Sequence, residues 1–133
     1  MGTDDLRSTD AAQLGVLYNE LTRIGYSDSG MTEHDDDLTD VVSEVDLRLM
    51  EPGLTLATLD GLIDGTETVE DRERLGIAIL EMVVRDRRDL WPAFDSRCRH
   101  DNRWNKAFGA AWVPKDIASQ MPLGLRATVM HID

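Results

Sequence analysis

Apolar residues recur at steps of three and four along the first half of the chain, which is the spacing of one face of an α-helix. The pattern predicts helices over 9–24, over 32–51 and over about 55–63. Thr9 is the expected cap of the first helix and Gly25 its expected stop. The residues predicted to face the core are Leu14, Leu17, Tyr18, Leu21, Ile24, Leu38, Val41, Val42, Val45, Leu49, Leu56, Leu59, Leu62 and Ile63.

A fourth helix is predicted from near Thr68, and its central segment, 75–84, is apolar on almost every side. A helix of this kind is expected at the centre of a core. A buried strand over 77–84 is the alternative, because the segment contains four β-branched residues.

Beyond Pro92 the pattern is weaker. It fits one more amphipathic helix, closed by Pro114, with Trp104, Phe108, Ala111 and Trp112 on its buried side. Residues 125–132 alternate loosely, as a strand or a frayed end would. The predicted fold class is therefore all-α: a compact bundle of about five helices with a short irregular or strand-like tail, in a single acidic domain over 1–133.

The composition favours a soluble globular protein. A chain of 133 residues with 41% hydrophobic residues is long enough for a substantial core. The longest nearly apolar run, 75–84, is too short to span a bilayer, and the acidic start at 1–5 is unlike a secretory signal. Cys98 is the only cysteine, so no internal disulfide can form, and a reducing, cytoplasmic location is expected.

The net charge of −12 is unevenly distributed. Residues 1–60 contain 14 acidic and three basic residues, whereas 91–133 contain four and six. Phosphates would be repelled by the first half, so direct nucleic-acid binding there is disfavoured and a basic protein partner is favoured. Adaptation to high salt is the alternative explanation of the acidity.

A row of acidic residues lies along the second predicted helix. At 3.6 residues per turn, five of them fall within about 100° of arc, and they rise about 4 Å from one to the next. These residues are Glu33, Asp36, Asp37, Asp40 and Glu44. The rise is comparable to the spacing of about 3.4 Å between phosphates of a DNA strand. Like charges four residues apart cost about 0.2–0.5 kcal/mol per pair, although the helix dipole favours acids in the first turn. Two interpretations stay open: a partner-binding surface and a merely solvated helix face.

Several residues could hold a metal, but none of their patterns is complete. The His-Asp dipeptides at 34–35 and 100–101 are the element that metal phosphohydrolases of the HD superfamily use, yet the acids downstream are only Asp116 and Asp133. The acidic run at 35–37 does not have the spacing of a calcium loop. Cys98 with His100 and His131 could contribute to a zinc site, but the chain lacks the second close pair of ligands typical of such sites.

Nucleophilic catalysis has one candidate. Cys98 lies between Arg97 and Arg99 and near His100, a setting that lowers a thiol pKa. An incidental cysteine is the alternative, and the chain contains no nucleophile elbow and no phosphate-binding loop.

Basic and aromatic residues alternate over 97–112. Such a mixture can bind single-stranded nucleic acid. The aromatic residues have core spacing, however, so a packed helix with a basic outer face is the preferred interpretation. That face could also dock on the acidic half of a neighbouring copy.

These observations predict a non-enzymatic protein without a metal or cofactor that blocks a basic, nucleic-acid-binding or nuclease-like protein by presenting carboxylates where phosphates would bind. Inhibitors of bacterial or phage defence nucleases and toxin-neutralising immunity proteins work in this general way. Electrostatic steering would make association fast and salt-sensitive. Two alternatives remain: a small helical adaptor that forms oligomers through opposed acidic and basic surfaces, and a metal-dependent hydrolase of the HD type.

Overall fold

The computed structural model describes residues 6–27 and 35–132, and the side chains of 6–24 and 37–131. The chain divides into two compact units, Met1–Glu67 and Thr68–Asp133, and each is described by itself. Helices dominate both, and the only strands in the described residues are two three-residue segments, so the predicted all-α class with a strand-like tail is confirmed. The single domain over 1–133 stays a prediction.

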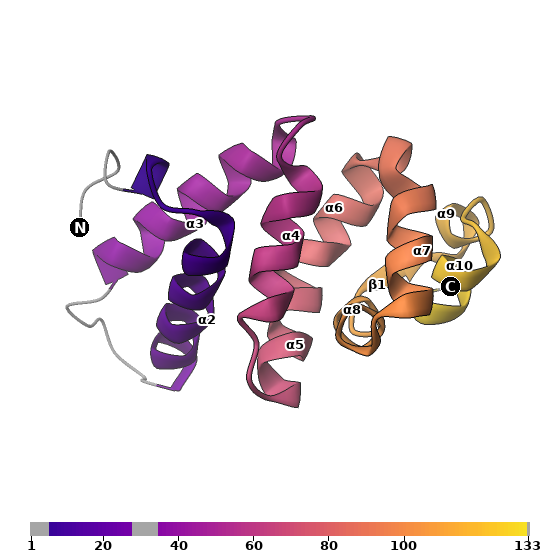
Figure 1. Cartoon of the computed structure of the whole chain (residues 1–133). Helices are drawn as coiled ribbons and strands as arrows, with labels where there is room; N and C mark the ends of the chain where they lie inside the picture. The colour runs from indigo at the N-terminus through magenta and orange to yellow at the C-terminus, as the bar shows by residue number, and fades with distance from the viewer. Residues whose placement is uncertain (1–5, 28–34, 133) are drawn as a thin grey trace. The chain divides into compact units, whose positions relative to one another are not determined.

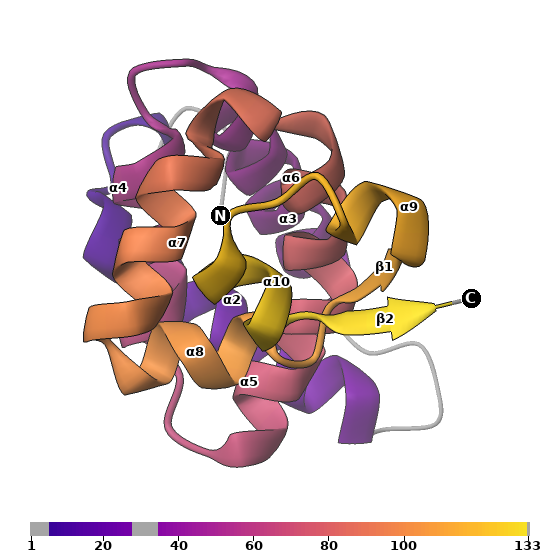
Figure 2. The same cartoon turned by 90° about the vertical axis from the view of Figure 1, so that its right-hand side faces the viewer.

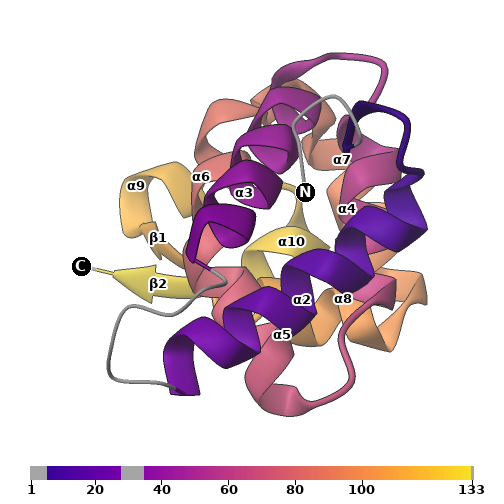
Figure 3. The same cartoon turned by 90° about the vertical axis from the view of Figure 1, so that its left-hand side faces the viewer.

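In its described residues the first unit forms the helices α2 (Ala11–Ser27), α3 (Asp35–Met50) and α4 (Thr55–Asp64). Each packs against the other two, and α2 runs obliquely to α3 (Figure 1, Figure 3). These are the three helices that the sequence predicts. At the start of α2, Asp10 and not Thr9 is the cap, because its Oδ1 accepts a hydrogen bond of 2.8 Å from the backbone N–H of Gln13. The helix also continues past Gly25, the expected stop.

The core of the first unit lies between these helices. Leu14, Tyr18, Leu21, Val41, Val45, Leu49, Leu59, Leu62 and Ile63 are buried in it. Gly15 and Gly61 let α2 and α4 approach closely, and the buried Asn19 links the two helices. Its Nδ2 donates to the carbonyl oxygens of Gly15 (2.8 Å) and Leu62 (2.9 Å).

The second unit begins with α5 (Val69–Leu75), a π-helical segment (Gly76–Leu80) and α6 (Glu81–Asp86), which follow one another without a break. The predicted fourth helix is therefore confirmed, and the alternative of a buried strand over 77–84 is wrong. The expectation that this helix is buried all round is also wrong: Ile77 is 58% exposed and Met82 is 38% exposed. Its neighbours in the unit, α8 (Asn102–Phe108) and β1 (Trp112–Pro114), leave one side of it open to water.

The rest of the second unit is built from short elements. Besides α8 and β1 these are a 3-10 turn (Arg88–Leu90), α7 (Trp91–His100), α9 (Lys115–Ala118), α10 (Leu123–Thr128) and β2 (Met130–Ile132). The two strands pair in parallel, with Trp112 opposite Met130, and lie next to α9 (Figure 2). The tail of the chain thus ends in a strand, one of the two predicted forms.

The amphipathic helix predicted up to Pro114 corresponds to α8, but it ends at Phe108. Trp104 and Phe108 stack in the core with ring centroids 5.6 Å apart, and Ala111 is buried as expected. The expectation that Trp112 is a buried helical residue is wrong, because the chain turns after α8 and places Trp112 in β1, where it is 43% exposed.

Candidate functional site

The described members of the acidic row, Asp37, Asp40 and Glu44, do not lie along the exposed side of α3. Asp37 and Asp40 are half-buried and Glu44 is only 6% exposed, while Glu33 and the side chain of Asp36 lie outside the described residues. Among the side chains of α3 that the structure describes, those of Thr39, Ser43, Asp46, Leu47 and Met50 are exposed. For Glu44, the prediction of an outward-facing carboxylate is therefore wrong. The segment before α2 lies beside the C-terminal end of this row, where Arg48 bonds both Glu44 and the backbone of Leu6 and Thr9.

Glu44 and Arg48 form a partly buried ion pair one turn apart. Arg48 Nε donates to Glu44 Oε2 at 2.8 Å, and their side chains are 12% and 7% exposed. The Nη2 of the same guanidinium donates to the carbonyl oxygens of Leu6 and Thr9, both at 2.8 Å. Arg48 thus attaches the segment 6–9 to α3, and its donors at Nε and Nη2 are already occupied.

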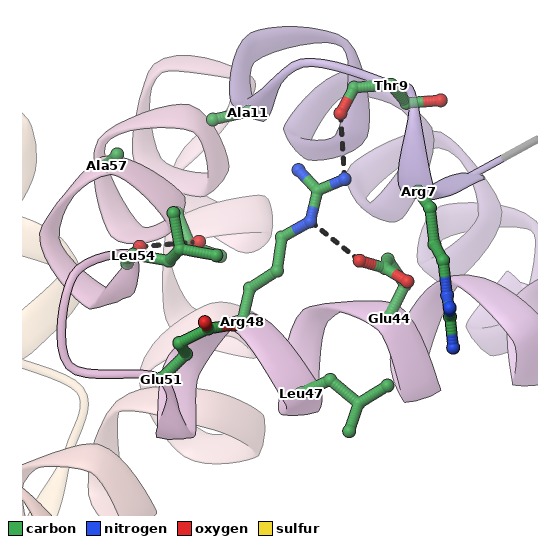
Figure 4. A pocket seen from close by; sticks show the side chains of 10 residues that line it. Arg7, Thr9, Ala11, Glu44, Leu47, Arg48, Glu51, Leu54 and Ala57 are labelled. Carbon is green, nitrogen blue, oxygen red and sulfur yellow. Dashed lines mark hydrogen bonds and ion pairs between the residues drawn. The ribbon is translucent and has the colours of Figure 1, made fainter.

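A pocket of about 570 Å³ opens beside this pair, between the segment 6–9, α3 and the start of α4 (Figure 4). Leu47 and Leu54 form apolar parts of its lining and are 60% and 40% exposed. Glu51, an exposed residue, also lines it. Arg7, likewise exposed, is another of the lining residues (Figure 4). The pocket therefore combines apolar surface with charged groups of both signs.

One atom of Glu44 has an unmet hydrogen-bonding capacity. The Oε1 of Glu44 is buried and has no hydrogen-bond partner within the part of the chain that the structure describes. A buried carboxylate oxygen in this state costs stability until a donor reaches it.

The first unit as a whole is strongly negative, although the lining of the pocket has two basic and two acidic residues, Arg7, Arg48, Glu44 and Glu51. The first unit contains 16 acidic and three basic residues. Two of the three bases have acidic partners within the unit: Arg48 is bonded to Glu44, and Arg23 Nη1 lies 3.7 Å from Glu67 Oε2. Acids from all parts of the unit are exposed, namely Asp10, Glu20, Asp46, Glu51, Asp64 and Glu67. Desolvation by partial burial raises the pKa of one of them, Asp46.

The candidates for metal binding that the structure describes do not come together. Among the described residues there is no group of three or more His, Cys, Asp or Glu side chains that could hold a metal ion. His100 Nδ1 lies 2.8 Å from the carbonyl oxygen of Ser96, and His131 Nε2 lies 2.8 Å from that of Arg126. The dipeptide at 34–35 and most of the acidic run at 35–37 fall outside the described side chains.

The thiol of Cys98 is not activated. It is 4% exposed, and its pKa is raised to about 12, first by desolvation and then by the carboxylates of Asp95 and Asp101. The prediction that the flanking arginines lower this pKa is wrong. Arg99 Nε bonds Asp95 Oδ2 at 2.8 Å, and the guanidinium of Arg97 lies 5.3 Å from the centre of the Trp104 ring.

The second unit has a groove of its own, with a volume of about 520 Å³. Four exposed apolar side chains line it: Val69 (56% exposed), Ile77 (58%), Trp112 (43%) and Met130 (43%). Lys106 is the exposed basic residue in its lining. The burial of Trp104 and Phe108 supports the interpretation of 97–112 as a mainly packed segment.

Neither concave surface is evident from the sequence. One signal of the first pocket is present there: Arg48 is the one base in a long acidic segment, placed four residues after Glu44. A spacing of four residues between an acid and a base predicts an ion pair within the helix, and such a pair would not leave Glu44 available as an exposed partner-binding carboxylate.

No described helix combines the length and the apolarity needed to cross a membrane. Comparison with known proteins gives the chain no relatives: no family model, no curated protein and no solved structure matches it.

Proposed function

We propose that the protein is a non-enzymatic binding protein whose acidic first unit engages a basic surface on a partner that binds or cleaves nucleic acid, and so blocks that partner. The observation that carries the proposal is the net charge of −13 on residues 1–67, against +1 on residues 68–133. A domain has no structural need for such an imbalance, because net self-repulsion destabilises a compact state. A basic partner would neutralise it.

The ion pairs of the first unit support this proposal. Arg48 neutralises one carboxylate inside the unit, and Arg23 lies near a second. The acids that face water outnumber the bases left to neutralise them, and they come from different elements: Glu20 from α2, Asp46 from α3 and Glu51 from the turn after α3. A negative field of this extent steers a basic protein into contact and competes with phosphates for its surface.

The experiment is capture from a lysate of the source organism on the immobilised chain, followed by elution with rising salt or with duplex DNA. The proposal expects a basic protein that is released by both. It also expects the captured protein to lose DNA binding when the purified chain is added. The variant E20Q/D40N/D46N is compared with the parent chain, because it removes three negative charges and leaves the size of the side chains almost unchanged.

This variant should capture the same partner much more weakly. Removing each charge would lower the rate of association, and the salt dependence of binding would become shallower. Capture that is insensitive to salt, or equal for the variant and the parent chain, would contradict the proposal.

A second candidate function is that of a small adaptor that assembles with copies of itself. The groove of the second unit favours it, because four exposed apolar side chains in one groove are typical of an interaction surface. Analytical ultracentrifugation over a range of protein concentrations tests this function. The test variant is Ile77→Ser, which changes a residue of the groove. The matched control is Leu123→Ser, because the side chain of Leu123 is 71% exposed and lies outside the groove. Oligomers that persist equally in both variants would exclude this groove as the contact.

A further inference from the structure

We infer that the outer side of α2 binds an amphipathic helix of the basic partner, with the apolar side chains of that helix on α2 and its lysines or arginines over the surrounding carboxylates. This inference rests on the proposed function and names the kind of segment that the acidic unit recognises. Two observations carry it: an exposed, mainly apolar stripe along α2 and the negative charge around that stripe.

The α2 stripe consists of Ala12, Val16, Glu20 and Ile24, which follow one another at steps of four residues and therefore share one side of the helix. All four side chains are exposed, that of Val16 to 46% and that of Ile24 to 37%. The sequence predicted a core position for Ile24, and this prediction is wrong. The other side of α2 packs against α3 and α4 (Figure 3), so the stripe is a second apolar side of the same helix.

An open pocket of about 460 Å³ lies along this side of α2. It is lined by Thr9, Ala12, Gln13, Val16 and Leu17, none of which is charged. An apolar side chain of a partner gains free energy by leaving water there, whereas a charged group would lose its hydration without meeting an opposite charge. The pocket therefore suits the apolar side of a partner segment.

The charge around the stripe is negative. Asp10, directly before α2, and Glu20, within the stripe, are both exposed. Arg23 is the only base in 11–27, and it is balanced by Glu67, whose Oε2 lies 3.7 Å from its Nη1. Lysines or arginines that flank the apolar side chains of a partner are attracted by this charge. A nucleic acid, an anionic membrane or a second acidic unit with its charge of −13 is repelled by it.

A helix fits the stripe better than an extended segment does. The stripe follows the axis of α2 for about 18 Å, a length that about 12 residues of a second helix also cover. Two helices pack by placing the ridges of one in the grooves of the other, with anchors at steps of three and four residues. An extended segment would need the edge of a strand, and the described part of the first unit contains no strand.

The test uses the full chain and a synthetic helical peptide of about 18 residues, with leucine along one side and lysine elsewhere. NMR follows the methyl groups of Val16 and Ile24 during the titration, and those of Leu47, an exposed residue of α3, serve as the internal control. A peptide with glutamate in place of every lysine is the control probe. We expect saturable shifts at Val16 and Ile24 that exceed those at Leu47, and binding of the glutamate peptide that is weaker by about tenfold or more.

Variants then locate the site. Val16→Ser should weaken binding of the lysine peptide by about fivefold or more, whereas Leu47→Ser should change it by less than about twofold. Glu20→Gln should weaken binding by about twofold to fivefold. Glu51→Gln removes the same charge from an exposed residue that does not line this pocket and should have a smaller effect. Circular dichroism confirms that each variant keeps its fold.

The inference is overturned if the methyl groups of Val16 and Ile24 do not shift, or if the glutamate peptide binds as well as the lysine peptide. Equal effects of Val16→Ser and Leu47→Ser would also overturn it. A further contrary result would be oligomers of the parent chain, seen by analytical ultracentrifugation, that Val16→Ser dissociates, because the stripe would then be a contact between copies.

Partner capture is measured separately, with the parent chain and with Val16→Ser. Salt-sensitive capture that is equal for the two proteins would remove the stripe and leave the proposed function. Binding of the lysine peptide without any captured basic partner would support the stripe as a helix-binding surface and contradict the proposed function. The two proposals can therefore fail independently.

Discussion

Gly15 of α2 and Gly61 of α4 bring the backbones of the two helices into direct contact. A Cβ atom on Gly15 would lie 1.9 Å from the carbonyl oxygen of Gly61, and one on Gly61 would lie 2.0 Å from that of Ala11. Both obstacles are backbone atoms, so a rotamer change cannot relieve them. The helices would have to separate, which would also strain the hydrogen bonds that Asn19 makes to both of them.

We therefore expect Gly61→Ala to lower the free energy of unfolding by roughly 3 kcal/mol, despite the better helix propensity of alanine. Urea denaturation measures this change. Gly53→Ala is the matched control, because a Cβ there meets no atom within 4 Å. Equal stability of the two variants would contradict the close contact of α2 and α4.

Removal of Arg48 should be costly. Arg48→Met would leave the buried carboxylate of Glu44 without its cation and release the carbonyl oxygens of Leu6 and Thr9. Breaking a buried pair from one side costs about 3–5 kcal/mol. Arg23→Met, which removes a more exposed pair with Glu67, should cost no more than about 1 kcal/mol. Urea denaturation of both variants compares the two losses.

The buried thiol of Cys98 should make stability fall at high pH. Its pKa is raised from 9.0 to about 12, so the folded state holds the proton more tightly than the unfolded state. The resulting stabilisation is complete below pH 9 and is lost as the pH rises from about 9 toward 12. In Cys98→Ala this component should be absent, so the difference in unfolding free energy between the two proteins should shrink over that interval.

The same burial predicts slow chemical modification. At pH 8 a thiol reagent should label Cys98 in the folded protein far more slowly than in urea, because only the thiolate reacts and the side chain is 4% exposed. Fast labelling without denaturant would contradict the inert thiol and reopen a catalytic role for this residue.

The cap of α5 should contribute a measurable part of the stability of the second unit. Thr68 Oγ1 accepts a hydrogen bond from the backbone N–H of Asp71, and Asp71 Oδ2 accepts one from the N–H of Thr68. Thr68→Ala should cost about 1 kcal/mol, whereas Thr68→Ser keeps the hydroxyl and should cost little. Thermal unfolding of the two variants provides the comparison.

The helices of the first unit were predictable because each is long enough to show a clear periodicity. Leu14, Leu21, Val41 and Val45 recur at helical spacing and are all buried. The same holds for the start of the fourth helix, where Thr68 is a readable cap. By contrast, α9 and α10 have four and six residues, too few for a period of 3.6 to be recognised.

The candidate site was only partly predictable. A helical wheel correctly groups Asp37, Asp40 and Glu44 on one flank of α3, because that angle depends on helix geometry alone. Whether the flank meets water depends on what packs beside it. In this protein residues 6–9 lie beside the flank, and Arg48 bonds them to α3. No local sequence pattern predicts this contact, because the two segments are far apart in the sequence.

By itself, the sequence determined the helical class, the main helices and the concentration of negative charge in residues 1–67, since these follow from local periodicity and from counting charges. Only the tertiary structure decided that Glu44 lies at a pocket and that Trp112 is exposed in a strand. It also decided that the Cys98 thiol is inert. The physical reason is that burial depends on contacts between residues far apart in the chain, and burial controls both the exposure and the ionisation of each side chain.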